Sequence, residues 1–453
     1  MIHLYKLNKF NIVLDTMSGS VHVVDELAFD VINMYGKVNE SEIVERVKAD
    51  FGASEAETLE LIGDIEELKQ EGKLFSAGER PQKANEGTPP IKALCLNISH
   101  ACNMRCGYCF AGQGEYGDDK QSLMPLETGK KAIDFLIENS KGRKNLDVDF
   151  FGGEPLLNWD IVKEIVRYAR TIEKEHGKNF RFTLTTNGLL IDDDVIEFTS
   201  EHMYNVVLSL DGKPETNDLM RKLVDKSGSY DTIVPKLKKL VEARGGKGYY
   251  IRGTFTRHNI EFVDDILHIA DLGFSELSME PVVAPPEADY AITEADLSKV
   301  SEQYERLAME MLTREKEGRG FSFYHFTLDL EGGPCLHKRV AGCGVGTEYL
   351  AVTPNGELFP CHQFVGNDDF IMGDVWRGVD NDKLREMFSE RDIYTIAECA
   401  DCWAKMYCSG GCAANSFNAA GSIGGVYKLG CELFKKRMEC AIMMQVARVI
   451  DKD

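Results

Sequence analysis

Three cysteines lie close together in the segment Cys102-Asn-Met-Arg-Cys106-Gly-Tyr-Cys109, which has the spacing CxxxCxxC. Thiolates at this spacing can bind three irons of one four-iron cluster, which leaves the fourth iron without a protein ligand. A substrate or a cofactor can bind at that open iron. The alternative is a zinc site, but structural zinc sites have four protein ligands and their CxxC pairs usually come in twos. The spacing therefore favours an iron–sulfur cluster with one open coordination position.

A second group of cysteines lies towards the C-terminus, where nine of the thirteen cysteines follow residue 330. Disulfides are rare in the reducing cytosol, so we interpret this group as metal or cluster ligands. Eight thiolates are enough for two four-iron clusters, and two zinc sites are the alternative. Cys95 and Cys440 are predicted to be buried apolar residues, and His362 is predicted to be a loop residue. The eight candidate ligands are Cys335, Cys343, Cys361, Cys399, Cys402, Cys408, Cys412 and Cys431.

The composition is that of a folded protein with two or three domains: 453 residues, 43% of them hydrophobic and 28% charged. The net charge of −22 disfavours nucleic acids and anionic lipid surfaces as partners. No apolar run reaches the roughly 18 residues of a membrane span, and the start MIHLYKLNKF lacks the features of a signal peptide. We therefore expect a cytoplasmic protein that binds neither nucleic acid nor a membrane.

The barrel-like part of the sequence covers residues 91–282, where apolar β-rich segments alternate with amphipathic helical ones. Six such units predict an α/β fold, a parallel sheet curled into a partial or full (β/α)6 barrel, with functional residues directly after the strands. The CxxxCxxC loop follows the first predicted strand, where such barrels carry catalytic residues. The predicted strands are ALCLNIS, LDVDFFG, FRFTLTT, NVVLSLD, YYIRGTFT and ELSMEPV.

The regular alternation ends near residue 320, so the cysteine-rich remainder is predicted to be a separate domain. Before the barrel, a hairpin, a third strand and three helical segments predict a small winged-helix-like domain. The segment SAGERPQKANEGTPP between them has no periodicity and is interpreted as a linker. The predicted boundaries are 1–75 for the first domain, 76–90 for the linker, 91–320 for the barrel and 321–453 for the cysteine-rich domain.

The loop CNMRCGYCF and the whole of residues 91–282 resemble the radical S-adenosylmethionine (SAM) superfamily. The resemblance implies that the open iron binds SAM and that one electron cleaves SAM to a deoxyadenosyl radical. It also implies a role for GGEP, after the second strand, in holding the amino group of SAM. The polar candidates also suit turns, Arg221 also suits the surface, and Val282 also suits the core. The implied SAM-binding residues are Tyr108, Gly152, Gly153, Glu154, Thr185, Asn187, Ser209, Asp211, Arg221 and Val282.

The C-terminal cysteines resemble, at every interval, the seven-cysteine SPASM extension of radical SAM enzymes that modify peptides and proteins. The cofactors implied are SAM and three 4Fe-4S clusters. Cys335 precedes the recognised pattern, and without it one iron of the first auxiliary cluster would be open to a substrate thiolate. The resemblance assigns Cys335, Cys343, Cys361 and Cys412 to a first auxiliary cluster, and Cys399, Cys402, Cys408 and Cys431 to a second.

The N-terminal domain is acidic, with a net charge of −8 over residues 1–90, so its third helix would repel DNA phosphates. A sheet edge that accepts an extended peptide is the better interpretation. The domain resembles the precursor-peptide recognition domains of maturases that act on ribosomal peptides. The opening MIHLYKLNKFNIVLD resembles the maturases of SCIFF peptides, a name that stands for six cysteines in forty-five residues.

These resemblances imply a radical SAM maturase that forms a thioether between a cysteine sulfur and a carbon of another residue in a cysteine-rich precursor peptide. Thioether formation removes two electrons from the peptide, so an auxiliary cluster suits as an electron acceptor, and an external one-electron donor is needed for SAM cleavage. We assign no catalytic side chain beyond the cofactor ligands. The alternatives are a SPASM maturase of the sulfatase type, which oxidises a side chain without a crosslink, and a non-catalytic iron–sulfur redox regulator.

Three four-iron clusters predict about twelve irons and about twelve sulfides per chain after anaerobic reconstitution. Iron, sulfide and zinc assays on the purified protein measure this content directly. Zinc in place of iron, or only about four irons per chain, would contradict the auxiliary-cluster assignment.

Overall fold

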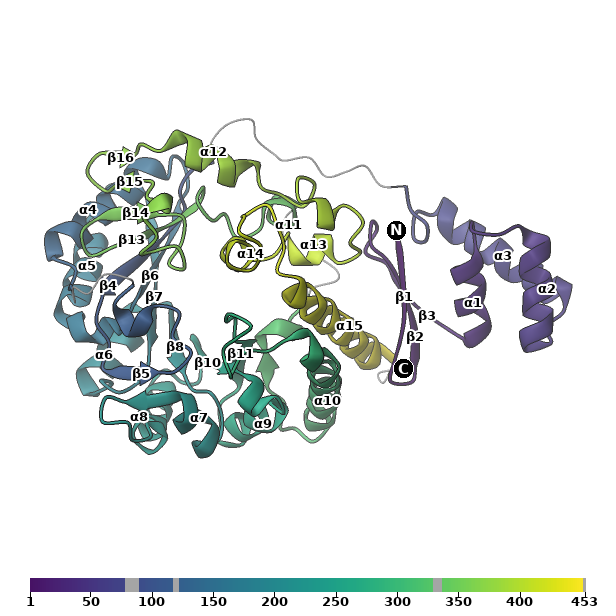
Figure 1. Ribbon diagram of the computed structural model, residues 1–453, viewed down its shortest axis with the longest axis horizontal. Coiled ribbons are helices and arrows are strands. Elements are labelled where there is room, and N and C mark those ends of the chain that lie inside the picture. Colours follow the sequence, from purple (N-terminus) through teal and green to yellow (C-terminus); the bar gives the residue numbers. More distant parts are fainter. Residues whose placement is uncertain (78–88, 117–121, 329–335, 451–453) are drawn as a thin grey trace.

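The computed structural model describes residues 1–453 except 78–88, 117–121, 329–335 and 451–453 (Figure 1). Its centre is an 11-stranded sheet with the strand order β12-β11-β10-β8-β7-β6-β4-β13-β14-β15-β16. The strands are β4 (Ala93–Ser99), β6 (Asn145–Gly152), β7 (Asn179–Thr186), β8 (Asn205–Ser209), β10 (Tyr249–Phe255), β11 (Glu276–Pro281), β12 (Ser322–Phe323), β13 (Tyr349–Val352), β14 (Glu357–Phe359), β15 (Gly373–Asp374) and β16 (Gly378–Val379).

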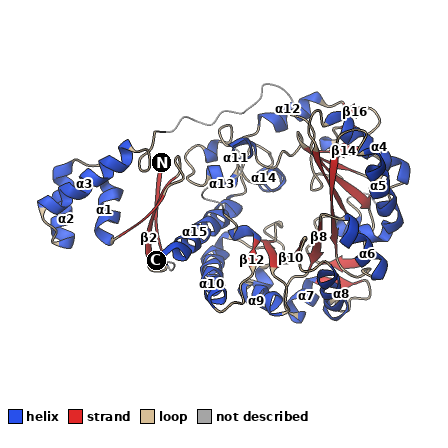
Figure 2. Ribbon diagram, turned by 180° about the vertical axis from the view of Figure 1, so that it is seen from behind, coloured by secondary structure: helices blue, strands red, loops and turns tan. Residues whose placement is uncertain are grey.

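The half of the sheet from β4 to β12 is parallel and forms the partial barrel, which confirms the α/β fold and the six predicted strands. Side chains alternate along each strand: Val148 and Phe150 of β6 are fully buried beneath the helices, whereas Asp149 and Phe151 face inwards. Figure 2 shows helices on the outer side of the curved sheet. The helices of this region are α4 (Leu126–Asn139), α5 (Trp159–Ile172), α6 (Asp193–His202), α7 (Pro214–Met220), α8 (Tyr230–Ala243), α9 (Val263–Asp271) and α10 (Leu297–Lys316).

The cysteine-rich region does not form a sheet of its own, because β13 pairs in parallel with β4 and β14 to β16 continue from it antiparallel. Strand β12 also lies after residue 320, at the opposite edge of the same sheet. These strands have two to four residues each, too few for a periodic pattern in the sequence. The helices of this region are α11 (Leu336–Ala341), α12 (Asp382–Glu390), α13 (Lys405–Cys408), α14 (Ala413–Ala420) and α15 (Lys428–Ile450).

The N-terminal region has a three-stranded antiparallel sheet followed by three helices. Each helix begins after a side chain that caps its first turn: Asp25, Asn39 and Ser54. No helix in the described part of the chain is both long and apolar enough to cross a membrane. The elements are β1 (Ile2–Leu7), β2 (Phe10–Asp15), β3 (Val21–Val24), α1 (Glu26–Met34), α2 (Glu40–Phe51) and α3 (Glu55–Gln70).

This small sheet packs on both faces, with its own helices on one side and α15 on the other (Figure 1). Val13 belongs to the core under α1 to α3, whereas Tyr5 and Ile12 belong to the main core of the molecule. The Tyr5 hydroxyl donates to the backbone carbonyl of Glu439 on α15 at 3.2 Å. The His3 ring lies 3.8 Å, between ring centroids, from the parallel ring of Trp403. The N-terminal region is therefore docked on the cysteine-rich region.

Replacing Tyr5 by Ala should lower the free energy of unfolding by about 3 kcal/mol, because it empties a buried site between the sheet and α15. Urea denaturation of the full chain measures this change. Val23→Ala is the control, since Val23 is 42% exposed on β3, and it should change the stability by less than about 0.5 kcal/mol. Equal stability of the Tyr5 variant and the unsubstituted chain would contradict the docking.

Candidate functional site

The three cysteines of the first group lie at the carboxyl end of β4, in a loop that contains the short strand β5 (Met104–Cys106). Strand β5 pairs antiparallel with β9 (Arg221–Leu223), which sets Cys106 opposite Arg221. Burial first, and then the nearby Glu154, Cys106 and Cys109, raise the pKa of the Cys102 thiol to about 12. The three thiols thus share one partly buried pocket of the loop.

Gly152 and Gly153 press the loop after β6 against the cysteine loop. A Cβ atom on Gly152 would meet the Ser99 carbonyl oxygen at 2.4 Å, and one on Gly153 would meet the Ala101 carbonyl oxygen at 2.2 Å. The Gly153 amide donates to the Ser99 carbonyl at 2.7 Å. Gly152 also has a φ of +132°, which other residues rarely adopt. The glycines therefore set the distance between the two loops.

Glu154 is completely buried, and its carboxylate accepts three hydrogen bonds from the protein. The donors are the amides of Leu156 at 3.1 Å and Asn187 at 2.8 Å and the hydroxyl of Thr186 at 2.8 Å. Burial raises the pKa of Glu154 to about 7. In this arrangement Glu154 joins the loop after β6 to the loop after β7.

Tyr108, Asp211 and Arg221 form a buried hydrogen-bonded group beside the cysteine loop. The Tyr108 hydroxyl donates to Asp211 Oδ2 at 2.5 Å, and Arg221 Nη1 donates to the Tyr108 hydroxyl at 3.0 Å. Arg221 and Asp211 form an ion pair at 3.9 Å between Nη1 and Oδ1. Arg221 lies at the start of strand β9 with 7% of its surface exposed, so its position is not a surface one.

The other expected SAM contacts lie at the same end of the barrel. Asn187 Nδ2 donates to Asn103 Oδ1 at 2.8 Å and lies 3.8 Å from the Cys102 sulfur. Thr185 and Ser209 are half-buried on the inner face of β7 and β8. Val282, directly after β11, is buried, and its amide donates to the Phe255 carbonyl at 2.8 Å. The structure thus gathers all ten expected residues around the mouth of the barrel.

The C-terminal cysteines fall into two groups whose thiols interact electrostatically. Cys335, the remaining candidate, lies outside the described residues. Among the described residues, no group of three or more His, Cys, Asp or Glu side chains is arranged to hold a single metal ion. One group comprises Cys343, Cys361 and Cys412, and the other Cys399, Cys402, Cys408 and Cys431.

The residues present suit the groups that the sequence implies. Soft thiolate donors are the ligands that iron–sulfur clusters use, and all three groups consist of thiols alone. Near the barrel mouth, the buried Nε of Arg221 and both polar side-chain atoms of Asn97 on β4 have no hydrogen-bond partner in the described chain. Buried polar atoms without partners are rare in folded proteins. They fit a polar ligand such as SAM.

Sequence reasoning missed a polar group on the inner face of the barrel. Glu280 on β11 forms ion pairs with Arg437 of α15 at 3.1 Å and with His325 at 3.4 Å. Burial lowers the pKa of His325 to about 4. Arg252 on β10 is exposed on the same inner face and makes no ion pair with a described residue. The alternation of inner and outer positions on β10 and β11 was the signal for Arg252 and Glu280.

A second missed feature is an aromatic contact between the first cysteine loop and the C-terminal cysteines. The His362 ring, next to Cys361, lies 4.8 Å from Phe151 and 5.8 Å from Phe110, between ring centroids. Phe110 follows Cys109 directly and is 56% exposed. Cys361 and Cys109 are thus connected through their neighbouring rings.

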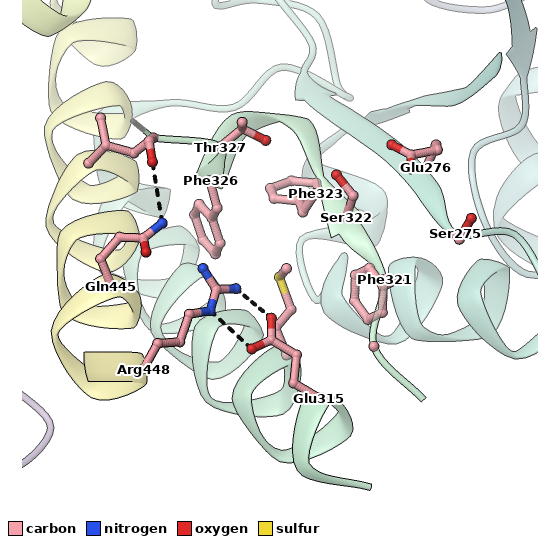
Figure 3. Close-up of a pocket in the computed structure, with 13 residues that line it drawn as sticks. Ser275, Glu276, Glu315, Phe321, Ser322, Phe323, Phe326, Thr327, Gln445 and Arg448 are labelled. Carbon is pink, nitrogen blue, oxygen red and sulfur yellow. Dashed lines mark hydrogen bonds and ion pairs between the residues drawn. The ribbon is translucent and has the colours of Figure 1, made fainter. Parts of the chain in front are cut away.

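A cavity of about 490 Å³ lies apart from all three cysteine groups, between β12, α10 and α15 (Figure 3). The Glu315 and Arg448 side chains form an ion pair across it, and Gln445 donates to the Leu328 carbonyl at 3.3 Å. None of the residues that line the cavity is a cysteine or an expected SAM contact. We therefore place the candidate site at the barrel mouth and the cysteine groups.

Comparison with known proteins identifies two domains. Residues 96–269 match the radical SAM superfamily, and residues 343–403 match SPASM, an iron–sulfur cluster-binding domain. The chain is 27% identical over 333 residues to the mycofactocin maturase MftC of Mycolicibacterium smegmatis. The aligned region covers 72% of this chain and 79% of that protein. It is 26% identical over 351 residues to a cysteine-type anaerobic sulfatase-maturating enzyme of Clostridium perfringens. The aligned region covers 72% of this chain and 89% of that enzyme.

Two solved structures share the fold. The enzyme anSMEcpe with bound AdoMet and the Cp18Cys peptide superposes with a TM-score of 0.65 at 20% identity, over 81% of this chain and 100% of that chain. Streptococcus suis SuiB bound to S-adenosylmethionine superposes with a TM-score of 0.52 at 18% identity, over 94% of this chain and 97% of that chain. The chain therefore carries a radical SAM domain over residues 96–269 and a C-terminal SPASM iron–sulfur cluster-binding domain over residues 343–403.

Proposed function

We propose that this protein is a maturase that joins a cysteine sulfur to a carbon of another residue in a ribosomally made, cysteine-rich precursor peptide. The observation that carries the proposal is the N-terminal sheet, whose outer edge pairs with no other strand of the described residues and which is docked beside the C-terminal cysteine groups. A sheet edge of this kind can bind an extended peptide as an added strand. The same chain thus combines a peptide-binding edge with a radical SAM barrel.

The outer edge of β3 offers main-chain groups for such a strand. Within the described chain β3 pairs only with β2, with Val13 opposite His22 and Ile12 opposite Val23. The Asp15 amide donates to the Ser20 carbonyl, so these two residues form a hydrogen-bonded pair. Every second pair of an antiparallel ladder is hydrogen-bonded, so Val13 and His22 form the next such pair. The pair of Ile12 and Val23 comes after it and is not hydrogen-bonded. The amide and carbonyl of Val23 therefore point away from β2, towards the open edge.

The barrel mouth is the proposed SAM site, with Cys102, Cys106 and Cys109 as cluster ligands. When bound, SAM and the cluster would supply a deoxyadenosyl radical that takes a hydrogen atom from the peptide. Arg221 is fixed by Tyr108 and Asp211, and its unpartnered Nε leaves a donor for a carboxylate. The remaining expected contacts, which lie at the carboxyl ends of β6, β7, β8 and β11 or directly after them, would surround the ligand and keep water out.

Electron balance explains the use of further clusters. Joining sulfur to carbon removes one hydrogen from each, that is, two protons and two electrons in all. One electron leaves with the hydrogen atom taken from the carbon. The second leaves as the carbon–sulfur bond forms, while the thiol proton passes to water. The reaction thus needs an external one-electron donor for SAM cleavage and an acceptor of the iron–sulfur class, for which the two C-terminal cysteine groups are the candidate ligands.

Mass spectrometry of the peptide product tests this function. The precursor peptide from a gene adjacent to that of the enzyme should lose two hydrogens per crosslink when it is incubated with reconstituted enzyme, SAM and a reductant. Each crosslink should also protect one cysteine from alkylation. A product that loses two hydrogens but keeps every cysteine open to alkylation would contradict thioether formation and support side-chain oxidation of the sulfatase-maturase type.

Replacing Cys102, Cys106 and Cys109 together by Ala should abolish formation of deoxyadenosine from SAM, because no ligands remain for the SAM-binding cluster. About eight irons per chain should remain on the C-terminal cysteines. Chromatography of reactions with dithionite measures the nucleoside. Cys440→Ala is the control, since Cys440 is a fully buried cysteine outside the three groups. Deoxyadenosine at unchanged yield in the triple variant would overturn this assignment.

Replacing Val23 by Pro should weaken binding of the precursor's leader about tenfold, because it removes one main-chain donor from the open edge of β3. The ladder to β2 should survive, since that amide does not take part in it. Val23→Ala removes the side chain and keeps the donor, so it should bind the leader as the unsubstituted chain does. Fluorescence anisotropy with a labelled leader measures both affinities. Equal affinity of the Pro and Ala variants would rule out strand addition at this edge.

A further inference from the structure

Arg391 lies between the two C-terminal cysteine groups. It follows α12 directly and has 9% of its surface exposed. Its guanidinium interacts electrostatically with Cys343 and Cys412 of one group and with Cys399 and Cys408 of the other.

The hydrogen bonds of Arg391 fix the turn that connects the two groups. Its Nη2 donates to the carbonyls of Gly410 at 2.6 Å and Gly411 at 3.3 Å, and its Nε donates to the carbonyl of Ile423 at 2.6 Å. Gly410 and Gly411 lie in the segment between Cys408, in one group, and Cys412, in the other. Ser409, Gly410 and Gly411 have φ values of 58°, 82° and 70°, so this turn is in the left-handed region throughout.

The charge of Arg391 has no counter-charge in the described protein. It forms no ion pair with a described carboxylate, and all three of its hydrogen-bond acceptors are neutral carbonyls. A buried charge is strongly unfavourable unless an opposite charge compensates it. Four-iron clusters held by thiolates are anionic, and reduction by one electron makes them more negative. The residues around Arg391 supply such an anion on each side once the clusters are in place.

We propose that Arg391 is the shared counter-ion of both auxiliary clusters, and that its charge raises the reduction potential of each. The proposal rests on the proposed function only for the identity of the clusters. A positive charge stabilises the reduced, more negative form of a neighbouring cluster. Both clusters then accept an electron from the peptide more readily. Arg391 acts through the clusters and touches no substrate, so it is a positioning residue and not a catalytic one.

The test is a potentiometric titration, followed by electron paramagnetic resonance, of the reconstituted full chain in the C102A/C106A/C109A background, where only auxiliary clusters contribute signals. Arg391→Gln keeps amide donors for the carbonyls and removes the charge. Arg391→Lys keeps the charge. Arg385→Gln is the matched control, because Arg385 lies on α12, which ends directly before Arg391. It also donates to carbonyls, those of Pro89 and Thr347, without an electrostatic contact to a cysteine.

In Arg391→Gln both auxiliary clusters should have lower reduction potentials. At a fixed ambient potential, the ratio of reduced to oxidised cluster should fall at least tenfold, which corresponds to about 59 mV for a one-electron couple. Arg391→Lys and Arg385→Gln should stay within threefold of the unsubstituted background. Unchanged potentials in Arg391→Gln, or a shift in only one cluster, would overturn the shared role.

Iron content separates an electrostatic role from a purely structural one. If Arg391→Gln lost auxiliary iron while Arg391→Lys kept about eight irons at native potentials, the charge would be confirmed as the required feature. Loss of iron from both variants would show that Arg391 only fixes the turn, and the proposal would fail. Thioether formation by the unsubstituted enzyme is assayed separately, so failure of the proposed reaction is distinguishable from failure of this inference.

Discussion

The position of strand β4 is the constraint on which the rest of the site depends. All seven residues of β4 are buried, and the strand pairs in parallel with β6 on one side and β13 on the other. Its carboxyl end presents the CxxxCxxC loop. Cys361 lies two residues after β14 and interacts electrostatically with Cys95 in the middle of β4. Cys95 is about 13 Å along the strand from Ser99, the last residue of β4 before the cysteine loop. One strand thus sets the separation between the first cysteine loop and the C-terminal cysteines.

Polar groups inside the barrel follow from the same sheet. Polar and charged side chains line the inner face of the barrel, and two of them, Asp211 after β8 and Glu280 on β11, have charged partners from other elements. Asp211 is paired by Tyr108 and Arg221, and Glu280 by Arg437. Pairing offsets the desolvation of these charges and fixes the loops that carry them. Among the buried polar atoms without a partner in the described chain, those of Asn97 and the Nε of Arg221 lie near the mouth of the barrel, where a ligand is expected.

The sequence predicts those parts of the structure that depend on local patterns. The six barrel strands and the N-terminal strands and helices agree with the structure. The pairing of strands that lie far apart in the sequence left no such local pattern. Strands of two to four residues gave no signal that β13 joins β4, and nothing near Arg221 indicated that it starts a strand opposite Cys106.

The role of Arg391 could not be predicted for a different reason. Its sequence neighbours, Glu390 and Asp392, suggest an ordinary charged position at the end of a helix. Only the fold shows that the turn from Gly410 to Gly411 comes to lie against its guanidinium. The same holds for His325 and Arg437, which reach Glu280 from other elements. A charged side chain reveals its partner only when elements distant in the sequence are placed together.

Helix α15 connects the three parts of the molecule through side chains on two and a half turns. Cys431 belongs to the second cysteine group, Arg437 bonds Glu280 of the barrel at 3.1 Å, and Glu439 bonds His3 of the N-terminal sheet at 3.0 Å. At about 1.5 Å per residue, Cys431 and Glu439 are about 12 Å apart along the axis. Because a helix is stiff over this length, the N-terminal sheet cannot shift along α15 without disturbing either the second cysteine group or the inner wall of the barrel. The position of the N-terminal sheet relative to both is therefore set by the fold itself.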